Sequence, residues 1–137
     1  MLKLSNYDIY IFDCDGVILD SNQLKIDAMK NALSIQFSDK QVIDKCTSYF
    51  RNNFGKSRFH HVDIFVNELL PIDETQKESV RETILTNYSS QCKSLYLKAD
   101  ITPGFIPFIE SLSGSKYVAS GSEQQELRDV FNQRGLS

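Results

Sequence analysis

Two aspartates separated by one residue, Asp13 and Asp15, are the side chains of this chain best suited to chemistry. They follow an apolar run, Ile9 to Phe12, that is typical of a strand buried on both faces of a parallel sheet. In an extended backbone residues i and i+2 point to the same side, so both carboxylates are expected together. Their expected place is the carboxyl end of the strand, where open α/β sheets bind ligands, and Gly16 lets the chain turn away there.

Two carboxylates at one site repel each other, so this arrangement favours a bound cation. The chemistry that it predicts is phosphoryl transfer with Mg²⁺, a hard ion that prefers oxygen ligands, held by Asp13 and Asp15. Asp13 would attack phosphorus and form an aspartyl-phosphate. Asp15 would protonate the leaving group and then deprotonate the water that hydrolyses the intermediate. The alternative interpretation of the same residues is an acidic surface turn without chemistry.

The residues from Phe12 to Val17, followed by Asp20 and Ser21, resemble the first motif of the haloacid dehalogenase-like (HAD) superfamily, hydrophobic-DxDGV-x-x-D-S. The resemblance is greatest to the branch that contains β-phosphoglucomutase and phosphoglycolate phosphatase. It implies an α/β fold, in which a Rossmann-like core carries an inserted helical cap domain. It also implies an Mg²⁺-dependent phosphatase acting on a small phosphorylated metabolite, with the backbone carbonyl of Asp15 reaching the metal.

A second candidate site follows the apolar run Tyr117 to Ala119, in the sequence Ser120-Gly121-Ser122. A hydroxyl, backbone N–H groups and a helix N-terminus together suit a phosphate group. Ser122 and Gln125 are expected to form the capping box of that helix. Such caps are common as structural features, but this one resembles the second HAD motif, whose Ser or Thr binds the transferring phosphoryl group. The resemblance implies that Ser120 and Gly121 bind the substrate.

Helical periodicity dominates the segment between the two candidate sites. Residues 22–97 are predicted to form a bundle of amphipathic helices, which are expected to begin near Ser21, Ser38, Ser57 and Asp73. The position of this segment resembles that of the cap in the HAD branch named above. Residues 1–21 and 98–137 are accordingly assigned to the core.

The predicted cap contains one candidate for substrate binding, Arg58. The sequence Gly55-Lys56-Ser57-Arg58 resembles the G-x-S-R segment of β-phosphoglucomutase-like caps, which implies that Arg58 contacts the substrate. A planar guanidinium suits this task because it binds phosphate or carboxylate bidentately. A solvated arginine at the start of a helix is the alternative.

Composition excludes several classes of function. The chain has 137 residues and a net charge of −3, and its basic residues are scattered, which argues against a nucleic-acid surface. No apolar run approaches the roughly 20 residues that span a bilayer, and the N-terminus lacks a signal-peptide pattern. The three cysteines are widely spaced, as expected for reduced thiols in a cytoplasmic protein.

Two motifs of the resembling family have no counterpart in this chain. HAD enzymes of this branch also carry a third motif with a lysine and a fourth with acidic residues, both beyond the second motif. We therefore expect a partial core with an open sheet flank, which invites self-association, and a truncated chain. The alternatives to a phosphatase are a phosphosugar mutase of the β-phosphoglucomutase kind and a non-catalytic HAD remnant that acts as a binding module.

Overall fold

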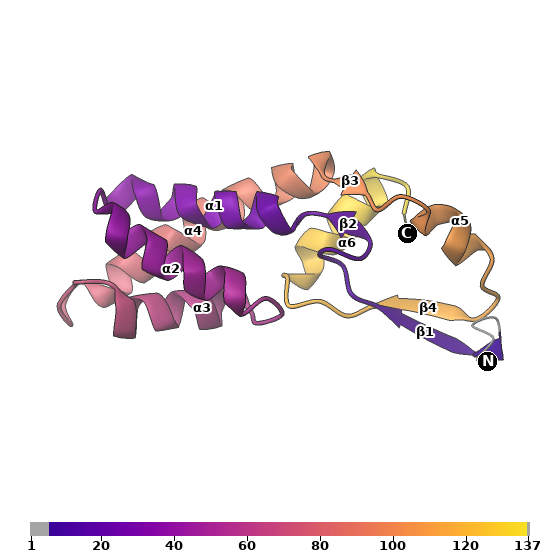
Figure 1. Ribbon diagram of the computed structural model, residues 1–137, viewed down its shortest axis with the longest axis horizontal. Helices are drawn as coiled ribbons and strands as arrows, with labels where there is room; N and C mark the ends of the chain where they lie inside the picture. The colour runs from indigo at the N-terminus through magenta and orange to yellow at the C-terminus, as the bar shows by residue number, and fades with distance from the viewer. Residues whose placement is uncertain (1–5, 137) are drawn as a thin grey trace.

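The computed structural model describes residues 6–136 and shows a mixed α/β architecture with two lobes (Figure 1). The first, which we call the helical lobe, contains α1 (Asn22–Gln36), α2 (Lys40–Asn52), α3 (Arg58–Ile64), the π-helical turn η2 (Phe65–Leu69) and α4 (Lys77–Lys98). The second, the sheet lobe, contains β1 (Ile9–Phe12), β2 (Leu19–Asp20), β3 (Asp100–Ile101), α5 (Phe105–Glu110), β4 (Ser115–Val118) and α6 (Gln124–Gln133). Among the described residues, no helix is both long enough and apolar enough to cross a membrane.

The helical lobe contains the predicted helices, although three of their starts differ from expectation. Helix α4 begins at Lys77, after Gln76, rather than next to Asp73. Asp39, rather than Ser38, caps α2, because its carboxylate accepts a hydrogen bond from the backbone N–H of Gln41 at 3.0 Å. Ser21 makes no side-chain cap for α1, since its hydroxyl donates to Asp15 instead. The lobe is held together by a continuous apolar core, whose fully buried members include Met29, Leu33, Phe65, Ile84, Tyr88 and Cys92.

His61 is a buried polar group in the interior of the helical lobe. It is 1% exposed, and its ring centroid lies 4.7 Å from that of Phe50. Its Nδ1 atom has no hydrogen-bond partner among the described residues. Burial lowers the pKa of His61 from 6.5 to about 4, and the charge of His60 acts in the same direction. The imidazole is therefore neutral at neutral pH.

We predict that acid destabilises the protein through His61. The unfolded chain binds a proton at this residue near pH 6.5 and the folded chain only near pH 4, so the free energy of unfolding falls as the pH drops through that interval. The loss below this interval is about 3 kcal/mol, since one pKa unit corresponds to about 1.4 kcal/mol. Urea denaturation across the interval measures it. His61→Phe should remove most of this pH dependence. His60→Gln should retain most of it, because burial is the larger cause of the shift. An unchanged dependence in His61→Phe would contradict the prediction.

The sheet lobe is built on a parallel pair of strands, β1 and β4. Ile9 lies opposite Ser115, and Phe12 lies opposite Val118. Helix α5 packs on this pair through Phe12, whose ring centroid lies 5.6 Å from that of Phe105. A second pair, β2 and β3, is antiparallel and lies where the chain passes between the lobes (Figure 1). This second pair was not predicted.

The prediction that the Ile9–Phe12 strand is buried on both faces is wrong. Helices α5 and α6 lie on the same side of the sheet, and no described helix covers the other face (Figure 1). Ile9 and Ile11 point to that face by strand alternation, as does Tyr117, which lies opposite Ile11. These side chains are 59%, 68% and 58% exposed, respectively. An uninterrupted apolar run predicts a strand that is covered on both faces, but the described helices cover only one face of this sheet.

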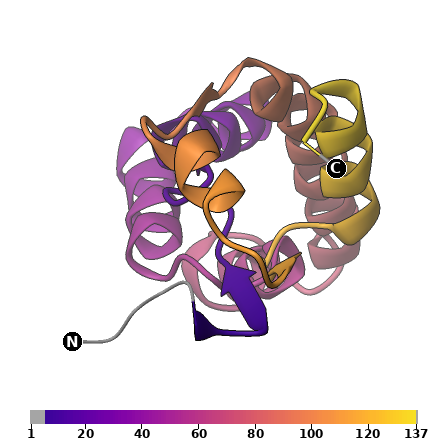
Figure 2. The ribbon, with the colours of Figure 1, turned by 90° about the vertical axis from the view of Figure 1, so that its right-hand side faces the viewer.

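Helix α6 connects the two lobes. It begins after β4 in the sheet lobe and lies alongside the C-terminal part of α4 (Figure 2). Arg134, just after α6, donates to the backbone carbonyl oxygens of Tyr96 and Ala99 at 2.8 and 2.6 Å. The segment that carries the second candidate site is therefore held against the helical lobe.

Candidate functional site

Asp13 and Asp15 lie in a tight turn that follows β1, rather than on the strand itself. The carbonyl oxygen of Cys14 accepts hydrogen bonds from the N–H groups of Val17, Ile18 and Leu19, and Gly16 has φ of +79°. Gly16 thus makes the sharp turn that was predicted for it. Cys14 between the aspartates is fully buried, and burial raises the pKa of its thiol to about 12, so Cys14 serves packing.

The Asp15 carboxylate is the centre of a largely buried polar cluster. Its Oδ1 accepts from the hydroxyls of Ser21 at 2.6 Å and Tyr96 at 3.1 Å. Its Oδ2 accepts from the ammonium of Lys25 at 3.0 Å and the hydroxyl of Ser122 at 3.3 Å. These donors come from α1, α4 and the loop after β4, so the cluster joins both lobes at Asp15.

Sequence reasoning did not find Lys25 and Tyr96. Lys25 is 9% exposed, and its ammonium also donates to Ser122 at 3.1 Å. Burial and the adjacent Asp15 raise the pKa of Tyr96 far above its usual value, so its phenol keeps the proton that it donates. One signal was available: Lys25 stands four positions before Met29, which places a charged residue within the buried stripe of α1.

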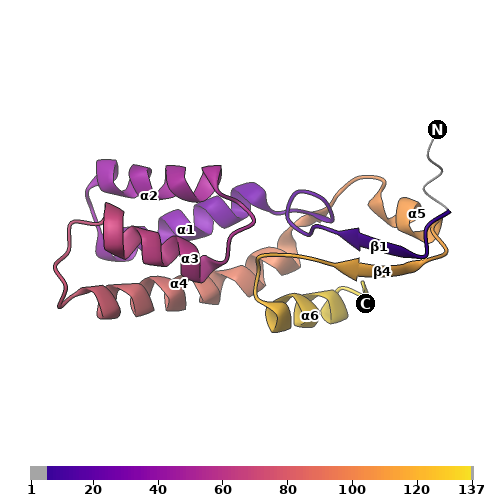
Figure 3. The ribbon, with the colours of Figure 1, turned by 90° about the horizontal axis from the view of Figure 1, so that it is seen from below.

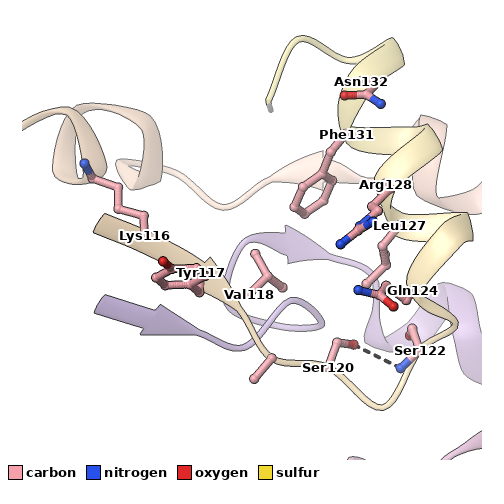
Figure 4. Close-up of a pocket in the computed structure, with 11 residues that line it drawn as sticks. Lys116, Tyr117, Val118, Ser120, Ser122, Gln124, Leu127, Arg128, Phe131 and Asn132 are labelled. Atoms are coloured by element: carbon pink, nitrogen blue, oxygen red, sulfur yellow. Dashed lines mark hydrogen bonds between the residues drawn. The ribbon is translucent and has the colours of Figure 1, made fainter. Parts of the chain in front are cut away.

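Asp13 and Ser120 come together because β1 and β4 are parallel neighbours. The N–H of Ala119 donates to the carbonyl oxygen of Phe12 at 2.8 Å, so the next residue of each strand lies at the same edge. Asp13 is exposed, and its Oδ1 accepts a local hydrogen bond from the N–H of Cys14 at 2.8 Å. The Ser120 hydroxyl oxygen accepts from the N–H of Ser122 at 3.1 Å (Figure 4). Asp13 and Ser120 therefore follow neighbouring strand ends at the same edge of the sheet.

The N-terminus of α6 differs from its prediction. Glu123, rather than Ser122, is the cap, and its carboxylate accepts from the N–H groups of Gln125 at 3.2 Å and Glu126 at 2.8 Å. The Ser122 hydroxyl instead belongs to the Asp15 cluster. Because an acidic side chain already occupies these two N–H groups, they do not serve as an anion site in this arrangement.

Gly121 lies where the loop after β4 packs closely against the helical lobe. A Cβ atom at this position would lie 2.7 Å from the carbonyl oxygen of Gly55 and 3.0 Å from that of Lys56. Both atoms belong to backbone, which cannot move aside as a flexible side chain could. The absence of a side chain at Gly121 therefore allows the two loops to pack together.

Replacing Gly121 with alanine should lower the free energy of unfolding by about 2 kcal/mol, because the new methyl group overlaps the backbone of the other lobe. Urea denaturation compares this variant with Ser113→Ala, a change at an exposed residue of the turn before β4. If the two variants had equal free energies of unfolding, the loops that contain Gly121 and Gly55 would be able to move apart without a loss of stability.

Arg58 is placed at the contact between the lobes and away from solvent. It is 7% exposed, and it donates to Glu126 of α6 at 2.8 Å and to Ser89 of α4 at 2.9 Å. Its guanidinium carbon lies 5.0 Å from the ring centroid of Tyr88. The structure thus joins Arg58 to α6, the helix that follows Ser120, and its guanidinium is engaged by protein groups.

The acidic residues offer Mg²⁺ a limited set of ligands. Within residues 6–136, no three His, Cys, Asp or Glu side chains form a group that could hold a metal ion. The exposed Asp13 carboxylate fits a hard cation, which would complete its coordination with phosphate oxygens and water. The Asp15 side chain does not fit, since the ammonium of Lys25 lies against its Oδ2.

Comparison with models of protein families gave no match, and neither curated proteins nor solved structures showed significant similarity to this chain. The resemblance to the HAD superfamily therefore rests on the motif residues themselves.

Proposed function

We propose that this chain is a phosphomonoester hydrolase of the HAD kind, which hydrolyses a small phosphorylated metabolite in the cytoplasm through an aspartyl-phosphate on Asp13. One observation carries the proposal: the exposed Asp13 carboxylate follows β1 directly beside the Ser120 loop of the parallel strand β4. A nucleophile and a hydroxyl donor at adjacent strand ends suit phosphoryl transfer. In this proposal the sheet lobe is part of a Rossmann-like core and the helical lobe is its cap.

The proposed reaction has two steps. In the first, an Asp13 oxygen forms a bond to phosphorus while the bond to the leaving oxygen breaks, and that oxygen takes a proton from Asp15. In the second, water attacks phosphorus, returns a proton to Asp15 and releases phosphate, which regenerates Asp13. Ser120 would donate a hydrogen bond to a phosphoryl oxygen throughout.

Other groups would support these steps. Mg²⁺, held by Asp13, would neutralise negative charge on the phosphoryl oxygens. The cluster around Asp15 fixes the orientation of its carboxylate, and the contact with Lys25 at 3.0 Å has to open before Asp15 carries the proton of the first step. Arg58 would contact the substrate only after its ion pair with Glu126 breaks.

Phosphate release from p-nitrophenyl phosphate, measured with Mg²⁺ and with a chelator, tests the proposal. We expect turnover that requires the metal, together with an acyl-phosphate that hydroxylamine traps. Soluble, folded protein that gives neither product would overturn the proposal for this chain.

A binding module is the second candidate function, and the bare sheet face favours it. Ile9, Ile11 and Tyr117 expose apolar surface of the kind that marks interaction sites. This alternative predicts that Asp13 can be replaced without a change in any property except metal affinity.

A further inference from the structure

A groove of about 760 Å³ runs along β4 beneath α6 (Figure 4). Its floor is the strand itself, from Lys116 to Ala119, and it continues to Ser120 and Ser122. Its roof is formed by side chains that α6 directs toward the strand, which are Gln124, Leu127, Arg128 and Phe131 (Figure 4). Seen from below, α6 lies on the side of β4 away from β1 (Figure 3). The groove therefore borders the strand edge that β1 does not use.

That edge of β4 presents backbone hydrogen-bonding groups at strand spacing. In the described part of the chain, β4 has one neighbouring strand, β1. The N–H groups of Ser115 and Ala119 point to β1, where they donate to Asp8 and Phe12. Because N–H and C=O directions alternate along a strand, those of Lys116 and Val118 point the other way, into the groove. An edge of this kind is a template for a further strand.

The charges around the groove are of one sign. Lys116 and Arg128 are its charged lining residues, and no acidic side chain of residues 6–136 lines it. Arg128 is exposed, and it makes no hydrogen bond or ion pair with the described residues. Between these cations the walls are apolar, with Val118, Leu127 and Phe131. The occupant that fits has apolar side chains and a negative charge.

We propose that the groove binds an extended peptide segment of a partner protein, which adds a strand to β4, directs apolar side chains toward α6 and places an acidic side chain beside Arg128. Main-chain pairing would provide affinity and the alternate side chains specificity, as in other complexes formed by strand addition. The proposal does not depend on phosphatase activity.

A second copy of this chain fits the groove less well than a single strand. Pairing two β4 edges would bring two sets of Lys116 and Arg128 together. Inserting β1 of a second copy would also bring its α5, which packs on Phe12, into the space that α6 fills. A single extended segment carries no such helix.

The test uses the full chain and a capped heptapeptide. Its odd positions are threonine, and its even positions are valine, glutamate and valine, in that order. Titration followed by NMR should shift the amide signals of Lys116 and Val118. Arg128→Glu should weaken binding about fivefold, and a peptide with lysine in place of glutamate should prefer this variant. Lys93→Glu, a change at an exposed residue of α4 outside the groove, is the matched control.

Two isomeric peptides distinguish strand addition from other modes of binding. One is N-methylated on three of its odd residues and the other on its three even residues, so each loses N–H groups along one edge of the extended peptide. One isomer should lose at least tenfold in affinity, since it cannot donate to β4, while the other should bind as the parent does. Equal binding of both isomers, no binding at millimolar peptide, or shifts confined to the bare sheet face would overturn the proposal. So would sedimentation as a dimer whose β4 edge is protected, because the occupant would then be a second copy.

Discussion

Replacing Asp13 with asparagine should abolish phosphate release, with a loss on the order of 10⁴-fold or more, because the amide cannot form the aspartyl-phosphate. The fold should be unaffected. Asp13 is exposed, and its one local hydrogen bond comes from the N–H of Cys14, which an asparagine oxygen can also accept. The free energy of unfolding should therefore stay within about 0.5 kcal/mol of the parent value. Steady-state kinetics with p-nitrophenyl phosphate, together with urea denaturation, measure both quantities.

Asp20→Asn is the matched control for this prediction. Asp20 is an exposed aspartate of β2 that belongs to the same motif but has no part in the proposed reaction, and its replacement removes the same charge. Turnover that survives in Asp13→Asn would exclude Asp13 as the nucleophile. Turnover lost equally in both variants would point to net charge near the turn rather than covalent chemistry.

Local sequence patterns were sufficient to predict the helices and the parallel strand pair. Apolar residues at helical spacing indicated the presence of α1 to α4, although α4 begins at Lys77 rather than near Asp73, and the turn at Gly16 followed from its conformational freedom. The position of Asp13 beside the Ser120 loop is a consequence of the parallel pairing of β1 and β4, whose carboxyl ends lie at one edge. These features depend on short stretches of chain.

The Asp15 cluster could not be predicted in the same way. Lys25 and Tyr96 are 71 positions apart in the numbering of the chain, and they meet Asp15 only because α1 and α4 pack together. Ser21 and Ser122 are good helix caps in isolation, yet both direct their hydroxyls to the buried carboxylate. Leaving a largely buried carboxylate unpaired costs more free energy than leaving a helix start uncapped. The two serines therefore bind Asp15 instead of capping the helices that their local sequence predicts.

The apolar pattern of β1 was misleading for a related reason. A strand composed of Ile9, Tyr10, Ile11 and Phe12 fits burial on both faces, but burial depends on which elements are present to cover it. One face receives α5, and the other receives no described helix. The amino-acid types of a strand show that its faces can be buried, but they do not show which elements of the fold cover those faces.

Arg58→Met should lower the free energy of unfolding by about 3 kcal/mol, because it leaves the Glu126 carboxylate without its cation at the contact between the lobes. The side chains of Arg58 and Glu126 are 6% and 11% exposed, so solvent replaces little of the lost interaction. The substitution also removes the hydrogen bond to Ser89 at 2.9 Å. Urea denaturation measures the loss, and faster amide exchange at Gly121 and Ser122 would locate it at this contact.

A double-mutant cycle separates the ion pair from ordinary packing. Arg58→Met with Glu126→Met should recover most of the lost stability, since replacing a buried pair by apolar groups is often neutral. The exposed pair of Arg81 and Asp63, at 2.7 Å with side chains 29% and 50% exposed, is the control. Arg81→Met should cost less than about 1 kcal/mol. If Arg58→Met cost no more than this control, the pair would not hold the lobes together, and Arg58 would be free to serve the substrate role that its motif implies.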